Sequence, residues 1–303
     1  MMTVDHIKNV LIIGSGTMGC QIGLQIALHG YKVTLYDVND KALESTQALL
    51  EDFCRLIVNQ GYAVPEDVKQ ALARISMTTD AVKAAENADL VSESVPEDPK
   101  LKGEVFGKFN ELCPNHTIFT TNTSTLVPSM YAEQTGRPER FLAFHFHGYV
   151  WQSNIVDVMP HPGTAPEIVD IIKDFAKRIG QIPIILRKEH HAYLFNEMLG
   201  ALNTAAVTMA VNGVASVEDI DRAWMGVMKF PIGPFGIMDQ VGLTTVWKIV
   251  QFWADAQGDP QLQKNAQYFK SFIDRGKLGI KSGQGFYTYP NPAFVRPDFV
   301  SGE

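Results

Sequence analysis

The sequence contains few cysteines and no long hydrophobic run. Its three cysteines, Cys20, Cys54 and Cys113, are widely spaced and odd in number, so neither a disulfide framework nor a thiolate zinc site is expected. No span reaches the roughly 20 apolar residues of a membrane helix, and the apolar run at 10–13 is too short for a signal peptide. We therefore expect a soluble protein of a reducing cytoplasm, with no membrane partner.

The sequence is also short of basic residues. It has 26 Lys and Arg against 33 Asp and Glu, which gives a formal net charge of −7, and no basic run is present. Phosphate backbones and anionic lipids attract basic patches, so nucleic acids and membrane surfaces are poor candidates as partners. We expect small molecules or copies of the same chain instead. With 303 residues, of which 46% are hydrophobic, the chain is long enough for two globular domains.

The first 75 residues predict an α/β unit followed by two helices. An apolar run at 7–13 stops at a glycine, residues 17–29 have helical spacing, and residues 32–36 are rich in β-branched and aromatic side chains. This order is typical of a βαβ unit. Two helical patterns at 41–60 and 65–74 then predict a helical hairpin inserted into the α/β alternation.

Strand patterns continue to residue 186 and then give way to helical ones. After residue 187 no strand pattern occurs before 285–289, and residues 290–298 predict an extended tail. We therefore predict an N-terminal Rossmann-type doubly wound, mostly parallel sheet over 1–187 and an all-α domain over 188–303. Further strands are predicted at 90–93, 117–121, 141–146, 155–159 and 182–186, and helices at 97–112, 166–179, 190–212, 216–229 and 242–257.

A glycine-rich loop, Gly14-Ser-Gly16-Thr-Met-Gly19, lies between the first predicted strand and the helix that follows it. These glycines permit a tight turn, close approach to a pyrophosphate and close packing of helix on strand. Asp37 ends the next strand, where a carboxylate accepts hydrogen bonds from ribose hydroxyls and repels the 2′-phosphate of NADP. NAD is the predicted cofactor; a flavin or a glycine turn without ligand are the minor alternatives.

Two histidines at alternate positions of a predicted strand are candidates for acid–base chemistry. His145 and His147 share one face because strand side chains alternate. Asp157 lies on the next predicted strand, and we expect a parallel neighbour that brings its carboxylate to His145. An isolated histidine is more often structural than catalytic. No third ligand at metal-binding spacing is evident, so no metal is predicted.

Several motifs occur in a fixed order along nearly the whole chain. They are VLIIGSGTMG at 10–19, DLVSESVPEDPKLK at 89–102, TNTSTL at 121–126, FHF at 144–146, NGVASVEDIDRAW at 212–224, FPIGPFGIMDQVGL at 230–243 and LGIKSGQGFYTYP at 278–290. Together they resemble the 3-hydroxyacyl-CoA dehydrogenase family. The resemblance implies oxidation of a 3-hydroxyacyl-CoA in fatty acid metabolism, NAD as cofactor and a homodimer formed through the helical domain.

The resemblance also implies roles for single residues. His145 matches the catalytic base, Asp157 the family's paired glutamate, Ser124 a serine near the reacting oxygen and Asn196 an asparagine that orients substrate. Glu97 and Lys102 match residues at the nicotinamide half of NAD. The cofactor-binding residues that we predict are Gly14, Gly16, Thr17, Met18, Gly19, Asp37, Glu97, Lys102 and Asn122.

Simpler interpretations of four of these residues stay open from the sequence. Ser124 could cap a helix that begins near Pro128, and Asn196 could be an ordinary polar residue on a helix face. Glu97 could interact with the first turn of a helix, and Lys102 could be a solvated helix charge.

The chain departs from the family pattern near the substrate. Where the family has HFFNP, this chain has His145-Phe-His147-Gly-Tyr149, and Glu197 replaces the arginine after the active-site asparagine. The hairpin that meets the CoA phosphates in the family contains only Arg55 as a basic residue over 45–67. Three hypotheses follow: a short-chain L-3-hydroxyacyl-CoA dehydrogenase, a dehydrogenase of a free 3-hydroxy acid or another substrate without CoA, and a silent NAD-binding protein.

Overall fold

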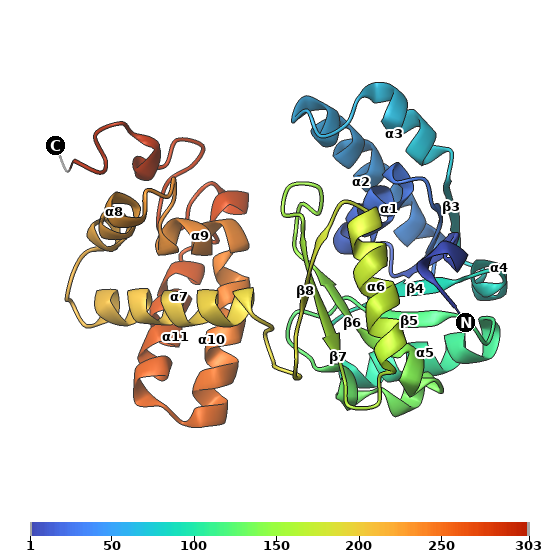
Figure 1. The fold of residues 1–303 in the computed structure, drawn as a ribbon. Helices are drawn as coiled ribbons and strands as arrows, with labels where there is room; N and C mark the ends of the chain where they lie inside the picture. Colours follow the sequence, from blue (N-terminus) through green and yellow to red (C-terminus); the bar gives the residue numbers. More distant parts are fainter. Residues whose placement is uncertain (1, 302–303) are drawn as a thin grey trace. The chain divides into compact units, whose positions relative to one another are not determined.

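Within the described residues the chain folds into two compact units, residues 2–194 and 195–301, each of which is described here by itself. The structure is a computed structural model that describes residues 2–301 (Figure 1). Within these residues no helix is both long and apolar enough to cross a bilayer.

The first unit contains an eight-stranded sheet in the order β3-β2-β1-β4-β5-β6-β7-β8. Every neighbouring pair is parallel except β6 and β7, which are antiparallel. The strands are β1 (Asn9–Ile13), β2 (Lys32–Tyr36), β3 (Ile75–Thr78), β4 (Leu90–Glu93), β5 (Ile118–Thr121), β6 (Phe141–Phe146), β7 (Ile155–Pro160) and β8 (Ile182–Ile185).

Helices cover both faces of this sheet, because alternate strand residues bury their side chains on opposite sides. Val10 and Ile12 of β1 pack with α1 (Thr17–Leu28) and α6 (Pro166–Arg178). Leu11 and Ile13 pack on the other face with α4 and α5. The remaining helices are α2 (Asp40–Asn59), α3 (Pro65–Leu72), α4 (Ala81–Ala85) and α5 (Pro99–Leu112), with short 3₁₀ turns at Val4–His6, Pro128–Met130, Glu133–Thr135 and Pro138–Arg140.

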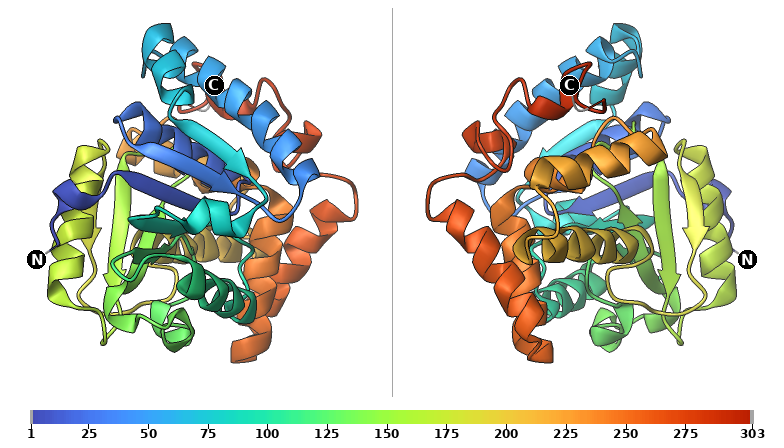
Figure 2. Two further views of the ribbon diagram at one scale, coloured as in Figure 1. Left: turned by 90° about the vertical axis from the view of Figure 1, so that its right-hand side faces the viewer. Right: turned by 90° about the vertical axis from the view of Figure 1, so that its left-hand side faces the viewer.

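The predicted helical hairpin is confirmed as α2 and α3, which stand out from one end of the unit in all views (Figures 1 and 2). Strand β3 was not predicted. Ile75 and Met77 alternate with polar Ser76 and Thr78, but the pattern covers only four residues at the sheet edge and is too short to predict a strand, so tertiary pairing with β2 decides their conformation.

The prediction that β6 and β7 are parallel neighbours is wrong. Phe146 pairs with Val156, and His145 with Asp157, in an antiparallel ladder. The connection between the two strands is too short for the crossover of about a dozen residues that parallel strands need. In the antiparallel ladder Asp157 is the direct cross-strand partner of His145.

The second unit is helical, as predicted, but it contains more helices than the sequence pattern indicated. Helix α7 begins at Phe195 and not at 190, because Ala192 and Tyr193 have positive φ angles that a helix cannot contain. The helices α9 and α11 were not predicted. The elements are α7 (Phe195–Val211), α8 (Val217–Met228), α9 (Pro234–Val241), α10 (Leu243–Gln257), α11 (Pro260–Ile273) and the 3₁₀ turns Ile280–Ser282 and Ala293–Val295.

The C-terminal segment packs against the second unit. The predicted strand at 285–289 is present only as isolated bridges of Gln284 with Gly279 and Thr288. The expectation of an extended tail at 290–298 is wrong, since Phe294 and Phe299 are buried in the core of the unit and the carbonyl of Phe299 accepts a hydrogen bond from Arg222. Apolar side chains supply the burial free energy that fixes this segment.

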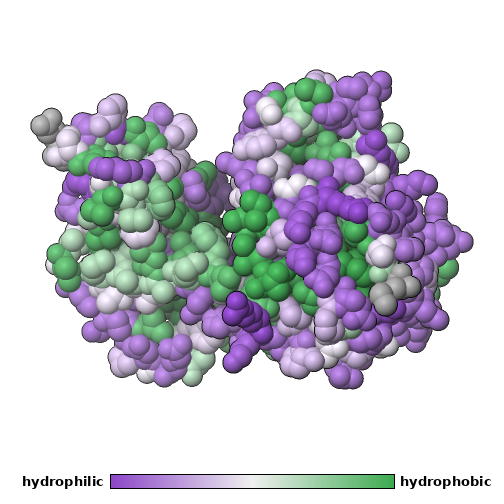
Figure 3. Space-filling model, viewed as in Figure 1, coloured by the Kyte–Doolittle hydropathy of each residue, from purple (hydrophilic) through white to green (hydrophobic). Residues whose placement is uncertain are grey.

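The second unit also exposes apolar side chains. Phe252 and Trp253 on α10 are 63% and 41% exposed, and Val227 on α8 is 80% exposed. Broad hydrophobic areas are visible on the face of this unit drawn in Figure 3. Exposed apolar area of this kind is typical of surfaces that associate with another protein.

Candidate active site

The glycine loop connects β1 to the N-terminus of α1 and leaves space beside its backbone. Gly14 has a φ of +93°, and a Cβ on Gly19 would lie 1.9 Å from the Gly14 carbonyl oxygen, so the turn and the packing of helix on strand both require glycine. A Cβ on Gly16 would meet nothing within 4 Å. Gly16 is the N-cap of α1 and offers no capping side chain, so the first-turn N–H groups of Thr17 and Met18 can face a phosphate.

Asp37, at the end of β2, is hydrogen-bonded to this loop. Its Oδ2 accepts from the Ser15 N–H at 2.9 Å and from the Ser15 hydroxyl at 3.0 Å, and its Oδ1 accepts from the Val38 N–H at 2.8 Å. A carboxylate oxygen can accept more than one bond, so Asp37 keeps capacity for ribose hydroxyls. These residues fit the adenosine and pyrophosphate parts of NAD.

His145, Asp157 and Ser124 form a continuous hydrogen-bonded chain. The Nδ1 of His145 lies 3.0 Å from Oδ2 of Asp157, and its Nε2 lies 3.2 Å from the Ser124 hydroxyl. An ionised carboxylate can only accept, so Nδ1 carries the ring proton and Nε2 presents its lone pair. Asp157 is one methylene shorter than the glutamate of the family pattern, yet the direct cross-strand pairing of the two residues brings it into contact.

Burial shifts the ionisation of this pair. Both side chains are only 3% exposed. Desolvation lowers the pKa of His145, although the hydrogen bond to Asp157 opposes the shift. Burial alone would raise the pKa of Asp157, but the two histidines that contact it hold this pKa below its usual value. The arrangement therefore favours a neutral imidazole beside an ionised carboxylate.

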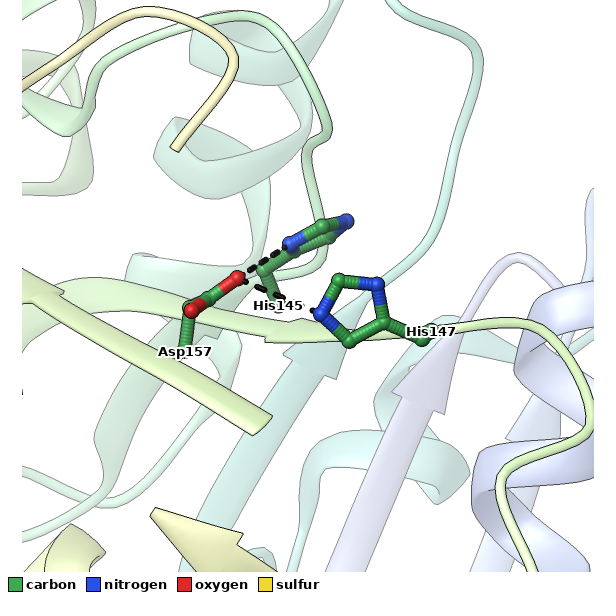
Figure 4. A group of neighbouring side chains, drawn as sticks. All are labelled: His145, His147 and Asp157. Carbon is green, nitrogen blue, oxygen red and sulfur yellow. Dashed lines mark hydrogen bonds and ion pairs between the residues drawn. The ribbon is translucent and has the colours of Figure 1, made fainter. Parts of the chain in front are cut away.

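His147, the first residue after β6, contacts the same carboxylate. Its Nε2 lies 3.4 Å from Oδ2 of Asp157, and its ring centroid lies 4.8 Å from that of His145 (Figure 4). The prediction that the two histidines share a face is confirmed. The sequence analysis found no third ligand for a metal, whereas the fold supplies one: single ligand atoms of His145, His147 and Asp157 all lie within 4.8 Å of one another.

Glu97 holds the loop that carries Ser124. One of its carboxylate oxygens accepts from the N–H groups of Ser124 and Thr125, at 3.0 Å each, and also from the Thr123 hydroxyl. Burial alone would raise the pKa of Glu97, but these bonds and the nearby charge of Lys102 keep it below its ordinary value. Ser124 does not cap the 3₁₀ turn at Pro128, whose N-cap is Val127.

Lys102 is a buried cation, so the interpretation of it as a solvated helix charge is wrong. Its side chain is fully buried, and its Nζ lies 2.7 Å from Glu93 and 3.5 Å from Glu97. Glu93 ends β4 and is also fully buried; burial raises its pKa, and Lys102 opposes this rise. Glu93 was not predicted from the sequence, where it looks like an ordinary polar residue at a strand end. Only the short distance to Lys102 in the folded protein distinguishes it.

Two further site residues were predicted from the sequence, Asn122 and Asn196. Asn122, just after β5, uses its side-chain oxygen to accept the N–H of Phe146 at 2.9 Å, which ties the ends of β5 and β6 together. Its predicted contact with the cofactor stays a prediction. Asn196 is the second residue of α7, in the second unit, and its role beside His145 also stays a prediction. Tyr193, which the sequence analysis did not select, is buried with its ring 4.6 Å from the His145 ring.

The site residues of the first unit meet at one edge of the sheet. Gly14, Glu93, Ser124 and His145 follow or end parallel strands at their carboxyl ends, and Asp157 joins them from the start of antiparallel β7. Ligands of open α/β sheets bind at this edge. A nucleotide loop and a buried imidazole with one unprotonated ring nitrogen fit hydride transfer coupled to proton transfer.

Comparisons with known proteins agree with this geometry. Residues 9–190 match the family described as "3-hydroxyacyl-CoA dehydrogenase, NAD binding domain", and residues 193–289 match "3-hydroxyacyl-CoA dehydrogenase, C-terminal domain". The human "Hydroxyacyl-coenzyme A dehydrogenase, mitochondrial" is 32% identical over 93% of this chain and 91% of its own length. A "Probable 3-hydroxybutyryl-CoA dehydrogenase" of Bacillus subtilis (strain 168) is 30% identical over 94% and 98%.

A solved structure adds a relative with a different substrate description. It is described as "Substrate-directed dual catalysis of dicarbonyl compounds by diketoreductase", with 40% identity, a TM-score of 0.88 and coverage of 95% of this chain and 100% of that one. The matched domains confirm the predicted cofactor, NAD, and the predicted fold. The chain belongs to the 3-hydroxyacyl-CoA dehydrogenase family of NAD-dependent oxidoreductases.

Proposed function

We propose that this protein transfers a hydride between NAD and C3 of a short-chain L-3-hydroxyacyl-CoA, such as 3-hydroxybutyryl-CoA, or the reverse from acetoacetyl-CoA. The observation that carries the proposal is the Ser124–His145–Asp157 chain, with hydrogen-bond distances of 3.2 and 3.0 Å. NAD, when bound, accepts the hydride at its nicotinamide ring. The side chains of the protein carry out the proton transfer and position the substrate.

His145 acts as the base in the oxidation. In the oxidation its unprotonated Nε2 takes the proton of the substrate hydroxyl while hydride leaves C3. In the reduction the same nitrogen returns a proton to the carbonyl oxygen. Asp157 fixes the ring tautomer and stabilises the imidazolium. The Ser124 hydroxyl, 3.2 Å from Nε2, holds the reacting oxygen in line with this nitrogen. Asn196 orients the substrate, as the family resemblance implies.

The proposal is tested by the oxidation of NADH with acetoacetyl-CoA, free acetoacetate and a dioxo ester, which is a dicarbonyl compound without CoA, at equal concentrations. We expect the highest kcat/KM with acetoacetyl-CoA. A value with the thioester that does not exceed that with free acetoacetate would contradict the choice of a CoA substrate. Turnover of none of the three would contradict the reaction itself.

A second candidate substrate is a dicarbonyl compound without CoA. Over residues 45–72 the hairpin carries two cations: Arg55 is paired with Asp52, and Lys69 lies 3.9 Å from Glu66, so neither of them faces a ligand alone. Such a surface attracts the phosphates of CoA weakly. The relative with 40% identity is described as acting on dicarbonyl compounds. A higher kcat/KM with the dioxo ester than with acetoacetyl-CoA would favour this candidate.

The exposed apolar residues of the second unit support a homodimer. Ile249, Phe252 and Trp253 lie on α10 and are all more than 40% exposed. Burial of such side chains against a second copy removes apolar area from water. Sedimentation equilibrium should give twice the mass of the 33.6 kDa chain, and a mass of one chain at micromolar concentration would contradict the dimer. The cytoplasmic location and a role in fatty acid metabolism stay predictions.

A further inference from the structure

One side chain of the site has no part in the proposed reaction. His147 directly follows β6. Its Nε2 is 3.4 Å from Oδ2 of Asp157, the oxygen that also contacts His145 (Figure 4). A dehydrogenase base needs one carboxylate to orient it and not a second imidazole on that carboxylate. The pair of histidines therefore calls for a separate explanation.

The three side chains form a ligand set that suits a divalent transition metal. Two imidazole nitrogens and one carboxylate oxygen are the protein ligands of many zinc sites that keep a fourth position for water. Zinc bonds of about 2.0–2.1 Å in tetrahedral geometry place ligand atoms about 3.3 Å apart. The distances from Asp157 Oδ2 to the two histidine nitrogens are 3.0 and 3.4 Å, and all three atoms lie within 4.8 Å of one another.

The surroundings also suit a metal. His145 and Asp157 are opposite residues of an antiparallel ladder, so the two strands hold them together before any ion binds. Their side chains are 3% exposed, whereas that of His147 is 17% exposed and leaves a route from solvent. A preformed, largely buried set of ligands costs little ordering entropy on binding.

We propose that His145 Nδ1, Asp157 Oδ2 and His147 Nε2 bind one zinc-like divalent cation and that this binding switches the enzyme off. The metal takes the position that the Nδ1 proton occupies between His145 and Asp157. The single proton of the neutral ring then moves to Nε2, which donates a hydrogen bond to the Ser124 hydroxyl oxygen. Nε2 has no lone pair left for the substrate proton, so the base is blocked without loss of the fold. The inhibitory part of this proposal rests on the proposed function, whereas metal binding does not.

Metal binding is tested first without any substrate. Co²⁺ is added to the full-length protein, free of NAD, and its visible absorption is recorded, followed by calorimetric titration with Zn²⁺. We expect one site per chain and an absorption typical of a cobalt ion with nitrogen and oxygen ligands. Replacing His147 with Asn should weaken binding on the order of a hundredfold or more, since loss of even an outer-shell partner costs 10–100-fold.

A matched control removes another histidine that pairs with a carboxylate. His116 lies 2.9 Å from Asp89, just before the amino ends of β5 and β4 and so at the sheet edge opposite the site, and its side chain is half exposed. His116→Asn should leave the Zn²⁺ affinity unchanged. Equal Zn²⁺ affinities of the wild type and His147→Asn, with both folded by circular dichroism, would overturn the metal site. Equal losses of Zn²⁺ affinity in His147→Asn and His116→Asn would overturn the metal site too.

Inhibition is tested by turnover with increasing Zn²⁺, each protein being compared with its own metal-free rate. We expect the wild type to lose its activity over the concentration range in which calorimetry shows binding, and His147→Asn to resist. Binding without loss of turnover would overturn the switch while leaving the site in place. If no substrate is turned over, the proposed function fails, and the Co²⁺ and calorimetric results still decide the metal site.

Discussion

Replacing His145 with glutamine is expected to lower kcat by a factor of about 10²–10⁴, because general acid–base catalysis contributes this much to a proton transfer. Glutamine has a similar length and its amide can take the place of Nε2, which lies 3.2 Å from the Ser124 hydroxyl, but it cannot accept and return a proton. NADH binding should change little, since the glycine loop is untouched. Steady-state rates and NADH fluorescence titration measure the two effects.

A second buried histidine provides the control for this variant. His161 is 8% exposed, and its Nε2 lies 2.8 Å from the carbonyl of Pro138, away from Ser124 and Asp157. His161→Gln should keep at least most of the wild-type kcat, whatever it does to stability. A His145→Gln variant that keeps more than a tenth of the wild-type kcat would show that His145 is not the base.

Replacing Lys102 with methionine is expected to lower the free energy of unfolding by about 3–5 kcal/mol, because it leaves a buried carboxylate without its cation. Lys102 Nζ lies 2.7 Å from Glu93, and both side chains are fully buried. The same variant frees Glu97, so the loop of Ser124 should loosen and kcat should fall as well. Urea unfolding monitored by fluorescence measures the stability.

A nearby lysine and a double variant show how much of the lost stability comes from the buried ion pair of Lys102 and Glu93. Lys100 is on the same helix, and its side chain is 86% exposed, so Lys100→Met should change stability by less than about 0.5 kcal/mol. Combining Lys102→Met with Glu93→Gln should recover much of the loss, since a neutral amide costs less to bury than an unpaired carboxylate. A loss below about 1 kcal/mol for Lys102→Met alone would contradict the buried ion pair.

The cofactor loop could be predicted from the sequence because its determinants are local. The tight turn, the close packing and the acidic residue at the next strand end are all set by residues within one βαβ unit, from Gly14 to Asp37. The structure shows each of them in place, with Asp37 bonded to the loop through Ser15. The placement of His145 and His147 on the same face follows equally from strand geometry, because side chains two residues apart along a strand point the same way.

The contacts that complete the site are not local, and the sequence pattern predicted them only in part. The family resemblance pointed to His145 and Asp157, but the antiparallel ladder that joins them depends on the short connection from β6 to β7. Glu93 and Lys102 meet because a strand end and a helix pack together, which no spacing in the sequence expresses. The metal ligand set was missed for the same reason, since Asp157 reaches His147 only in the folded sheet.

The reaction proposed for this protein moves a hydride between NAD and C3 of a 3-hydroxyacyl group, with His145 as the proton donor and acceptor. It is tested by mass spectrometry of the product from acetoacetyl-CoA and NADH carrying deuterium at both C4 positions, with wild type and His145→Gln. We expect 3-hydroxybutyryl-CoA with one deuterium at C3, formed at least a hundredfold faster by the wild type. Product without deuterium, or equal rates for the two proteins, would show that the protein does not work in this way.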